Sequence, residues 1–235
     1  MTIAIAHRGE PVENRENTLP SFLAAVSLGA DMVELDCRVT RDRRVVVLHD
    51  PTLERLWRVK KAAAELTFDE VRGLDVDGYH VPGLEEALNA VSVPVMVDMD
   101  DPASVLDVLG EVVSAGALGR CLFAGNLTGL EALRKKNADA RIALTWTERA
   151  LPSDALLEKL RPEFFNPRWD LLVPDGIAKM HNAGIGVSTW TVDDPARMAR
   201  LANMGADAII TNRVGLLVEL LRGRVAGASG TTSGA

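Results

Sequence analysis

The stretch VSTWTVDDPARMARLANMGADAIIT, residues 187–211, contains one complete strand–helix–strand unit. Residues 187–190 and 208–211 are short runs of strand-forming side chains, and residues 195–204 between them have the apolar spacing of an amphipathic helix. Gly205 follows that spacing directly, and glycine commonly ends a helix. Two strands joined through a helix can pair in parallel, so this unit predicts a parallel sheet.

The same alternation repeats along the 235 residues of the chain. Nine strand candidates lie at residues 3–6, 32–36, 45–49, 95–99, 121–124, 142–146, 163–166, 187–190 and 208–211. Helix candidates lie at residues 18–28, 84–90, 103–114, 130–136, 154–160, 176–182, 195–204 and 214–222. About eight such units predict a closed TIM (β/α)8 barrel, with a doubly wound open sheet as the alternative. Because nine candidates exceed eight places, one is surplus, and residues 163–166, between two prolines, are the weakest.

We expect a single domain over residues 1–222, because 47% hydrophobic and 25% charged residues are typical of a globular protein. Residues 50–82 are longer than a usual strand–helix loop, which predicts a small insertion over one end of the barrel. Residues 223–235 are rich in Gly, Ser, Thr and Ala, and we expect a disordered tail there.

The net charge of −7 argues against nucleic acid as a partner, because a phosphate backbone attracts basic surfaces. No apolar run approaches the ~18 residues of a membrane span, and the first residues lack the features of a signal peptide. Cys37 and Cys121 are too few for a disulfide framework. We therefore expect a cytoplasmic protein with no stable membrane anchor, and its oligomeric state stays open.

Titratable side chains follow or end four of the first strand candidates. They are His7 and Arg8, Glu34 and Asp36, His49 and Asp50, and Asp98 and Asp100. The carboxyl ends of the strands in a barrel of this type meet at one rim, where active sites form. The sequence therefore predicts that these groups share one site.

Neighbouring carboxylates on these strands suggest a bound cation. Strand side chains alternate between two faces, so Glu34 and Asp36 share one face and Asp98 and Asp100 share one face of their strand. Burying such pairs is costly unless a positive charge lies between them. Oxygen ligands suit Mg²⁺, Ca²⁺ or Mn²⁺ better than zinc, so the pattern predicts one of these divalent cations.

A cation, two histidines and an arginine at one rim indicate phosphoryl chemistry. The cation polarises phosphoryl oxygens, and the planar fork of Arg8 can bind a phosphate oxygen. Of His7 and His49, one can accept the proton of the nucleophile while the other protonates the departing alcohol. Which histidine does which stays open at this point.

Several motifs in this order resemble those of the glycerophosphodiester phosphodiesterase family. They are His7-Arg8-Gly9, Glu16-Asn17-Thr18, Glu34-Leu35-Asp36, His49-Asp50-Pro51-Thr52-Leu53, Val81-Pro82-Gly83-Leu84-Glu85-Glu86, Trp190-Thr191-Val192-Asp193 and Gly205-Ala206-Asp207-Ala208-Ile209-Ile210-Thr211. The resemblance spans nearly the whole chain and implies a TIM barrel that hydrolyses glycerophosphodiesters to glycerol 3-phosphate and an alcohol.

By position, the resemblance also implies roles for individual residues. His7 and His49 correspond to the acid–base pair. The metal ligands would be Glu34, Asp36 and Asp98. Arg8 would contact phosphate, Trp190 would form a wall of the substrate pocket, and Glu16 would lie beside the metal or orient a partner. Asp50 is a further supporting residue, next to His49.

The fourth strand departs from the family pattern. The family usually has Glu-x-Lys where this chain has Asp98-Met99-Asp100, so Asp100 replaces a positive charge with a negative one. Our hypothesis is that Arg168, or a cation within residues 55–61, takes over the role of the lysine. The alternatives are that Asp100 binds a second metal or a positively charged headgroup.

A second departure and two rival functions stay open. Leu56-Trp57-Arg58 replaces a loop that contains Thr and Gly in the family, which leaves the headgroup undetermined. One rival is a barrel that binds phosphodiesters without turnover. The other is phospholipase D-like or cyclising activity, as in the related sphingomyelinase D enzymes. A metal-dependent amidohydrolase is disfavoured because the first strand lacks a His-x-His pair.

Overall fold

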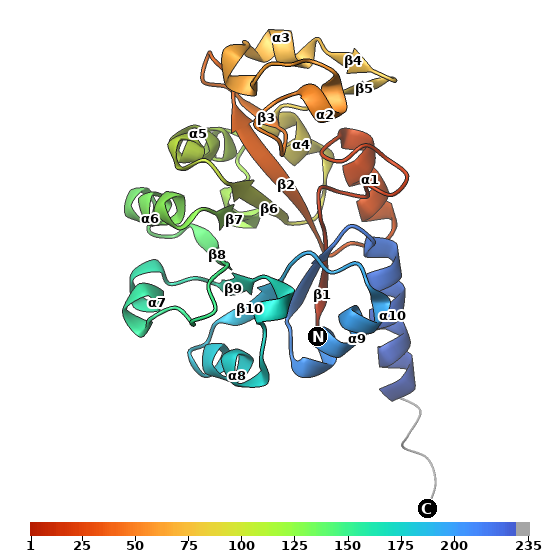
Figure 1. Cartoon of the computed structure of the whole chain (residues 1–235), viewed down its shortest axis with the longest axis vertical. Helices are drawn as coiled ribbons and strands as arrows, with labels where there is room; N and C mark the ends of the chain where they lie inside the picture. Colours follow the sequence, from red (N-terminus) through yellow and green to blue (C-terminus); the bar gives the residue numbers. More distant parts are fainter. Residues whose placement is uncertain (229–235) are drawn as a thin grey trace, which may run out of the picture.

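The computed structural model describes residues 1–228, with side chains described up to residue 223, and it forms a closed barrel (Figure 1). The parallel barrel strands are β1 (Ile3–Ala6), β2 (Met32–Val39), β6 (Val95–Met99), β7 (Cys121–Gly125), β8 (Arg141–Trp146), β9 (Phe164–Pro167), β10 (Gly186–Thr189) and β11 (Ala208–Thr211). Each pairs with the next in chain order, and β11 pairs with β1 to close the ring. The predicted TIM barrel is confirmed, and the open sheet is excluded.

Helices surround the barrel on its outside (Figure 1). They are α1 (Leu19–Ser27), α4 (Leu84–Ala90), α5 (Val105–Ser114), α6 (Leu127–Lys136), α7 (Asp154–Leu160), α8 (Pro174–Asn182), α9 (Pro195–Met204) and α10 (Val214–Ala228), with short 3-10 turns η2 (Pro102–Ser104), η3 (Leu118–Arg120) and η4 (Trp169–Leu171). Outward-facing strand residues such as Val33 and Val97 belong to the large core beneath these helices. Inward-facing residues such as Ile5, Met96 and Leu122 fill the centre of the barrel.

The last helix differs from its predicted extent. α10 continues past Arg222 to Ala228, so the first part of the predicted tail, residues 223–228, is helical. The rest of that tail, residues 229–235, lies outside the described residues. Within the described part of the chain, we find no helix with both the length and the apolar character needed to cross a membrane.

The surplus strand is not the one expected from the sequence. Residues 163–166 were the weakest candidate, yet β9 occupies this place in the barrel and pairs with β8 and β10. The additional strand is β3 (Val45–Val47), which pairs antiparallel with the end of β2 beyond the barrel. β3 is antiparallel because the connection from β2 is short. Residues 40–44 can form a hairpin, whereas a parallel crossover needs roughly a dozen residues or more.

Residues 50–82 build a small layer beyond the carboxyl end of β2 (Figure 1). The elements of this insertion are α2 (Glu54–Trp57), η1 (Ala63–Glu65), α3 (Phe68–Arg72), β4 (Asp75–Val76) and β5 (Tyr79–His80). Trp57 is buried in a separate hydrophobic cluster with residues such as Leu53 and Val71. The insertion therefore has its own core and can present side chains such as Arg55 to the barrel from a fixed position.

Candidate active site

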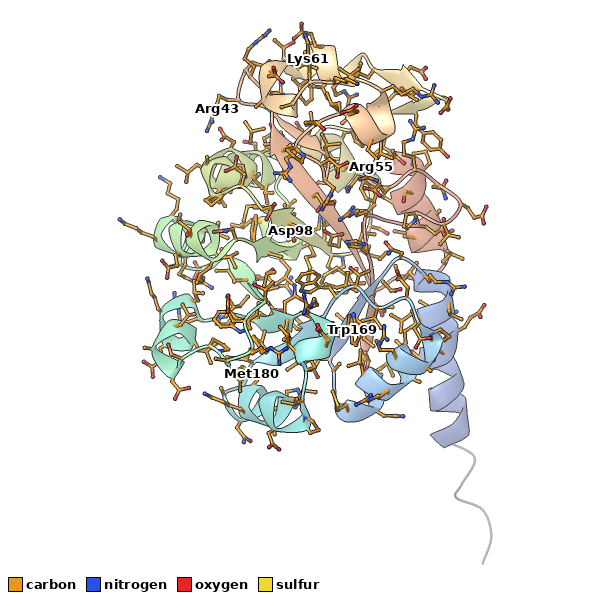
Figure 2. The ribbon with its side chains drawn as sticks, viewed as in Figure 1. Arg43, Arg55, Lys61, Asp98, Trp169 and Met180 are labelled. Carbon is orange, nitrogen blue, oxygen red and sulfur yellow. The ribbon has the colours of Figure 1, made fainter. Side chains whose placement is uncertain are left out.

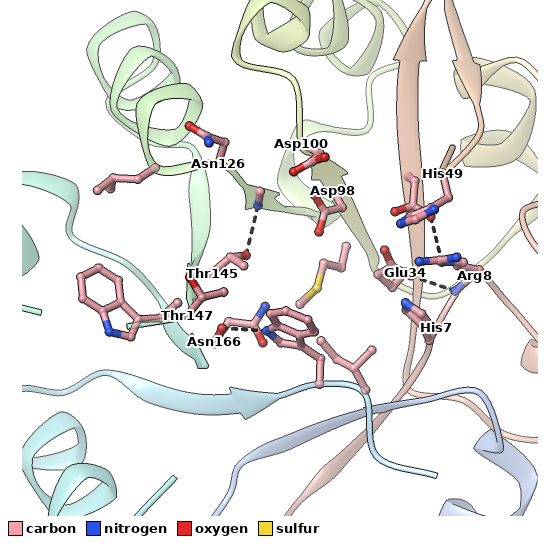
Figure 3. A pocket seen from close by; sticks show the side chains of 17 residues that line it. His7, Arg8, Glu34, His49, Asp98, Asp100, Asn126, Thr145, Thr147 and Asn166 are labelled. Atoms are coloured by element: carbon pink, nitrogen blue, oxygen red, sulfur yellow. Dashed lines mark hydrogen bonds and ion pairs between the residues drawn. The ribbon is translucent and has the colours of Figure 1, made fainter. Parts of the chain in front are cut away.

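A pocket of about 460 Å³ opens at the carboxyl ends of the barrel strands (Figure 3). Its lining residues are His7, Arg8, Glu34, Asp36, His49, Met96, Asp98, Asp100, Gly125, Asn126, Leu127, Thr145, Trp146, Thr147, Asn166, Trp190 and Ile210. The two histidines, the metal-ligand candidates and Arg8, all selected from the sequence, thus meet in one cavity. The sequence also selected Glu16, Asp50 and Arg168. Within the described residues, these three do not line the pocket.

The acidic side of the pocket is built by β2 and β6. Asp36 and Asp98 are register partners on these adjacent parallel strands, and Glu34 lies on the same face of β2 as Asp36. Burial, together with the charges of Asp36 and Asp98, raises the pKa of Glu34 well above its usual value. Burial and the charges of Asp36 and Asp100 raise the pKa of Asp98 to about 7. These carboxylates repel one another, and a bound cation would relieve that repulsion.

The donor chemistry of this cluster fits a hard divalent cation, but the present side-chain positions are those of an ion-pair network. Among the described residues, no group of three His, Cys, Asp or Glu side chains is arranged to hold a metal ion. Asp36 Oδ2 accepts a hydrogen bond of 2.7 Å from Asn17 Nδ2 and lies 3.2 Å from Arg8 Nε. Glu34 Oε2 accepts one of 2.8 Å from the backbone nitrogen of Arg8. A cation would compete with Arg8 and Asn17 for these oxygens or bind the second oxygen of each carboxylate.

The backbone at Arg8 and Gly9 has positive φ angles. The φ of Arg8 is 57° and that of Gly9 is 87°, so two consecutive residues adopt left-handed conformations. A Cβ atom on Gly9 would lie 2.3 Å from Ser21 Oγ, so glycine is required there. Arg8 Nε is buried and lies 3.2 Å from Asp36 Oδ2, but within the described residues no contact of this nitrogen has hydrogen-bond geometry. Strain and an unsatisfied donor at one residue are typical of a functional site.

His7 is oriented by the residue after the last strand. Its Nδ1 lies 2.8 Å from Asn212 Oδ1, which can only accept, so Nδ1 carries the hydrogen and Nε2 of the neutral ring can accept a proton. Asn212 in turn donates through its backbone nitrogen and Nδ2 to Asp193, both at 2.8 Å. Burial, followed by the charge of Arg8, lowers the pKa of His7.

His49 reaches the site differently from the way the sequence suggested. β2 extends beyond the barrel, and β3 runs antiparallel to it, back toward the rim. His49 follows the end of β3 and therefore lies at the rim. His49 Nδ1 lies 2.7 Å from Asp50 Oδ1. Hydrogen bonds from Arg55 lower the pKa of Asp50 to about 2, with a further contribution from His49. Asp50 is therefore a carboxylate that accepts the Nδ1 hydrogen of His49.

Glu16 and Arg168 both lie in ion pairs. Glu16 Oε1 accepts a hydrogen bond of 2.9 Å from Arg8 Nη1, which agrees with an orienting role. Arg168 is half-exposed and pairs with Asp170 through Nε and Nη2, at 2.5 and 2.7 Å. Within the described residues Arg168 is not part of the pocket lining, so the structure gives no support for substrate binding by Arg168.

The cation nearest to Asp100 is one that our sequence reasoning missed. Arg38 Nη2 lies 3.7 Å from Asp100 Oδ2, and Arg38 Nε donates a hydrogen bond of 2.9 Å to the carbonyl oxygen of His49. Arg38 stands two residues after Asp36 on β2, so the alternation that grouped Glu34 with Asp36 also points to Arg38. Within the described residues Arg38, like Arg168, is not part of the pocket lining, but it pairs with Asp100, which is, so it is a further candidate for the positive charge expected from Arg168 or residues 55–61.

Aromatic walls close the other side of the pocket. Trp190 Nε1 donates to the carbonyl oxygen of Asn166 at 3.0 Å, which fixes the indole that the sequence placed at the wall. Trp146 Nε1 donates to the carbonyl oxygen of Ala150 at 2.8 Å. Trp146 and Asn166 were missed, although each lies near the carboxyl end of a strand candidate. The pocket thus pairs an acidic, histidine-bearing side with an aromatic side.

Comparisons with known proteins identify the family and the fold. A model of the glycerophosphoryl diester phosphodiesterase family matches residues 7–216. A glycerophosphodiester phosphodiesterase of Caldanaerobacter subterraneus is 27% identical over 94% of this chain and 98% of its own. A probable glycerophosphodiester phosphodiesterase of Mycobacterium tuberculosis is 30% identical over 94% and 91%. Among solved structures, an Oleispira antarctica phosphodiesterase in complex with the product sn-glycerol-3-phosphate has a TM-score of 0.84 at 22% identity, covering 94% and 97%.

Proposed function

The chain belongs to the glycerophosphoryl diester phosphodiesterase family and is a phosphodiesterase, and we propose that it hydrolyses glycerophosphodiesters to glycerol 3-phosphate and an alcohol with a bound divalent cation. The observation that carries this proposal is the meeting of His7, His49 and the carboxylate cluster in one pocket. The Oleispira antarctica phosphodiesterase of the same fold holds sn-glycerol-3-phosphate as its product, which supports the same product here.

Glu34, Asp36 and Asp98 are the residues that would hold the cation. When bound, Mg²⁺, Ca²⁺ or Mn²⁺ supplies positive charge that polarises the phosphoryl oxygens. Arg8 offers a second positive charge beside the cluster and can donate to a phosphate oxygen through its planar guanidinium. Burial and, after it, the charges of Asp36 and Asp100 raise the pKa of Asp98, and this cost of holding several carboxylates together favours a cation at this position.

The two histidines have surroundings that suit opposite roles. Burial and Arg8 lower the pKa of His7, so its Nε2 is free to accept the proton of the attacking water. The Asp50 carboxylate accepts the Nδ1 hydrogen of His49 and orients the ring, and we assign to His49 Nε2 the proton that passes to the departing alkoxide. The oxygen–phosphorus bond to water forms, the bond to the alcohol breaks, and one proton passes through each imidazole.

The alcohol lies on the aromatic side of the pocket in this proposal. Trp190 and Trp146 form walls there, and Asp100, which follows β6 on the acidic side, supplies a negative charge at the rim of the same pocket that suits a cationic headgroup. Asp100 therefore serves headgroup recognition rather than a second metal.

The free, buried thiols of Cys37 and Cys121 support a cytoplasmic location, where thiols stay reduced.

A substrate screen tests the proposal. The purified full chain is incubated with glycerophosphocholine, glycerophosphoethanolamine, glycerophosphoglycerol and lysophosphatidylcholine, with Mg²⁺, Ca²⁺ or Mn²⁺ or with EDTA. We expect glycerol 3-phosphate from the water-soluble diesters, lost in EDTA and in His7→Ala and His49→Ala. Turnover of lysophosphatidylcholine alone, or release of a cyclic phosphodiester, would instead establish the phospholipase D-like or cyclising alternative.

A further inference from the structure

Arg55 lies outside the pocket but touches two carboxylates that each orient a pocket residue. It comes from α2 and lies between the insertion and the barrel, whereas Lys61 lies on the far side of the insertion (Figure 2). We propose that Arg55 is a positioning residue that couples the orientation of His49, through Asp50, to that of Arg8, through Glu16. This inference rests on the proposed function of the same site.

The first half of the arrangement leads from Arg55 to His49. Arg55 Nε donates to Asp50 Oδ2 at 2.6 Å, and Nη2 donates to Asp50 Oδ1 at 3.1 Å. This two-point contact fixes the plane of the carboxylate. Asp50 Oδ1 is also 2.7 Å from His49 Nδ1, so the orientation of the carboxylate determines the direction of the imidazole.

The second half leads from the same guanidinium to Arg8. Arg55 Nη2 donates to Glu16 Oε1 at 2.7 Å, and Nη1 donates to Glu16 Oε2 at 3.1 Å. Glu16 Oε1 also accepts the hydrogen bond from Arg8 Nη1 at 2.9 Å. Arg55 Nη2 therefore serves both carboxylates, and a movement of one shifts the donor of the other.

The charges in this network are balanced and partly exposed. Burial alone would raise the pKa of Glu16, but the hydrogen bonds and charges of Arg55 and Arg8 lower it below the usual value. The Arg55 side chain is 47% exposed, so solvent screens its ion pairs and their contribution to folding stability is small. We therefore expect the loss of Arg55 to affect geometry, and hence turnover, more than the free energy of unfolding.

Other cations of the insertion provide a matched control. Arg58 Nη2 pairs with Asp77 Oδ2 at 2.9 Å, and Lys60 Nζ lies 3.4 Å from Glu54 Oε1. Glu54 and Asp77 belong to the insertion itself, and Asp77 is held by a second partner, Arg15 Nη2 at 3.0 Å, when Arg58 is replaced. Arg58→Gln thus removes the same type of charge and side chain from the same layer without touching Asp50 or Glu16.

The test compares Arg55→Gln, Arg55→Lys and Arg58→Gln in the full chain with glycerophosphocholine as substrate. For Arg55→Gln we expect kcat to fall by about 10- to 100-fold and KM to rise, with an unchanged urea midpoint, while Arg58→Gln stays within about twofold. Arg55→Lys should recover only part of the activity, because an ammonium cannot fork to both carboxylates. The kcat losses of Asp50→Asn and Arg55→Gln should be less than additive when combined.

A second readout needs no turnover. The Nδ1 proton of His49, hydrogen-bonded to Asp50, is expected as a downfield proton resonance that disappears in Arg55→Gln and stays in Arg58→Gln. Wild-type kcat and KM in Arg55→Gln, fully additive losses, or an unchanged His49 resonance would each overturn the positioning role. Absence of hydrolysis by the wild type would count against the proposed function, while the resonance would still decide the role of Arg55.

Discussion

Asp36 on β2 and Asp98 on β6 stand directly beside each other in adjacent parallel strands, so their carboxylates face the same pocket. Burial, followed by the charges of Asp36 and Asp100, raises the pKa of Asp98 to about 7. Holding the charged carboxylates together without a cation lowers the free energy of unfolding. This cost depends on pH, and a bound cation would reduce it.

The pH dependence of stability should therefore carry a signature of Asp98. Its pKa rises from 3.8 to about 7 on folding, so between these values the folded protein binds more protons than the unfolded one. The contribution of Asp98 to the free energy of unfolding consequently falls as pH rises through this window. Urea unfolding in EDTA at pH 5 and pH 8 should show a smaller loss with pH for Asp98→Asn than for the wild type. Equal slopes for the two proteins would refute this contribution.

Removal of the Asn212 side chain should slow catalysis through His7. Asn212→Ala deletes the acceptor 2.8 Å from His7 Nδ1, so the ring can adopt the other tautomer and rotate. We expect kcat to fall by about 10- to 100-fold with little change in the melting temperature. Asn203→Ala, on the exposed face of α9, is the control and should leave kcat unchanged. An equal loss in both variants would point to a general effect.

Asp100 should influence which headgroup is preferred. Its side chain is 79% exposed and lies 3.7 Å from Arg38, so its field is screened and the effect is modest. Asp100→Asn should lower the ratio of kcat/KM for glycerophosphocholine over glycerophosphoglycerol by about two- to fivefold. Asp101→Asn, at the adjacent residue outside the pocket, should keep the ratio. A ratio that does not move in Asp100→Asn rejects headgroup recognition by this residue.

The backbone before α1 should not tolerate a side chain at Gly9. Gly9→Ala places a Cβ 2.3 Å from Ser21 Oγ at a φ of 87°, so both space and conformation oppose it. We expect a loss of at least about 1–3 kcal/mol in the free energy of unfolding and lower activity, because Arg8 must move. Gly110→Ala on α5, where no atom lies within 4 Å of the added Cβ, should instead be neutral or stabilising.

The barrel was predictable because its pattern is local. Each strand–helix unit can be recognised within about 25 residues, as in residues 187–211, and parallel strands with outer helices leave few topologies. The place of β3 was predicted wrongly, although residues 40–44 are too few for a crossover. Counting the residues between strand candidates, in addition to the candidates themselves, would have corrected it.

The site was predictable only in part, because its orientation depends on contacts between distant residues. Strand alternation grouped Glu34 with Asp36 and, carried further, would have included Arg38. The contact of His7 with Asn212 joins residues 205 positions apart and depends on the closing pair of β1 and β11. The place of Arg55 depends on how the insertion folds back over the barrel, which no local pattern specifies.

Attack of water on phosphorus at a site that needs a cation can be followed by hydrolysing glycerophosphocholine in ¹⁸O-labelled water, with the divalent cation that supports turnover, and observing the phosphorus by ³¹P NMR. We expect glycerol 3-phosphate that carries one ¹⁸O atom on phosphorus, formed by the wild type and lost in Asp98→Asn and in EDTA. Unlabelled phosphate in the product, or full turnover in EDTA, would contradict this expectation.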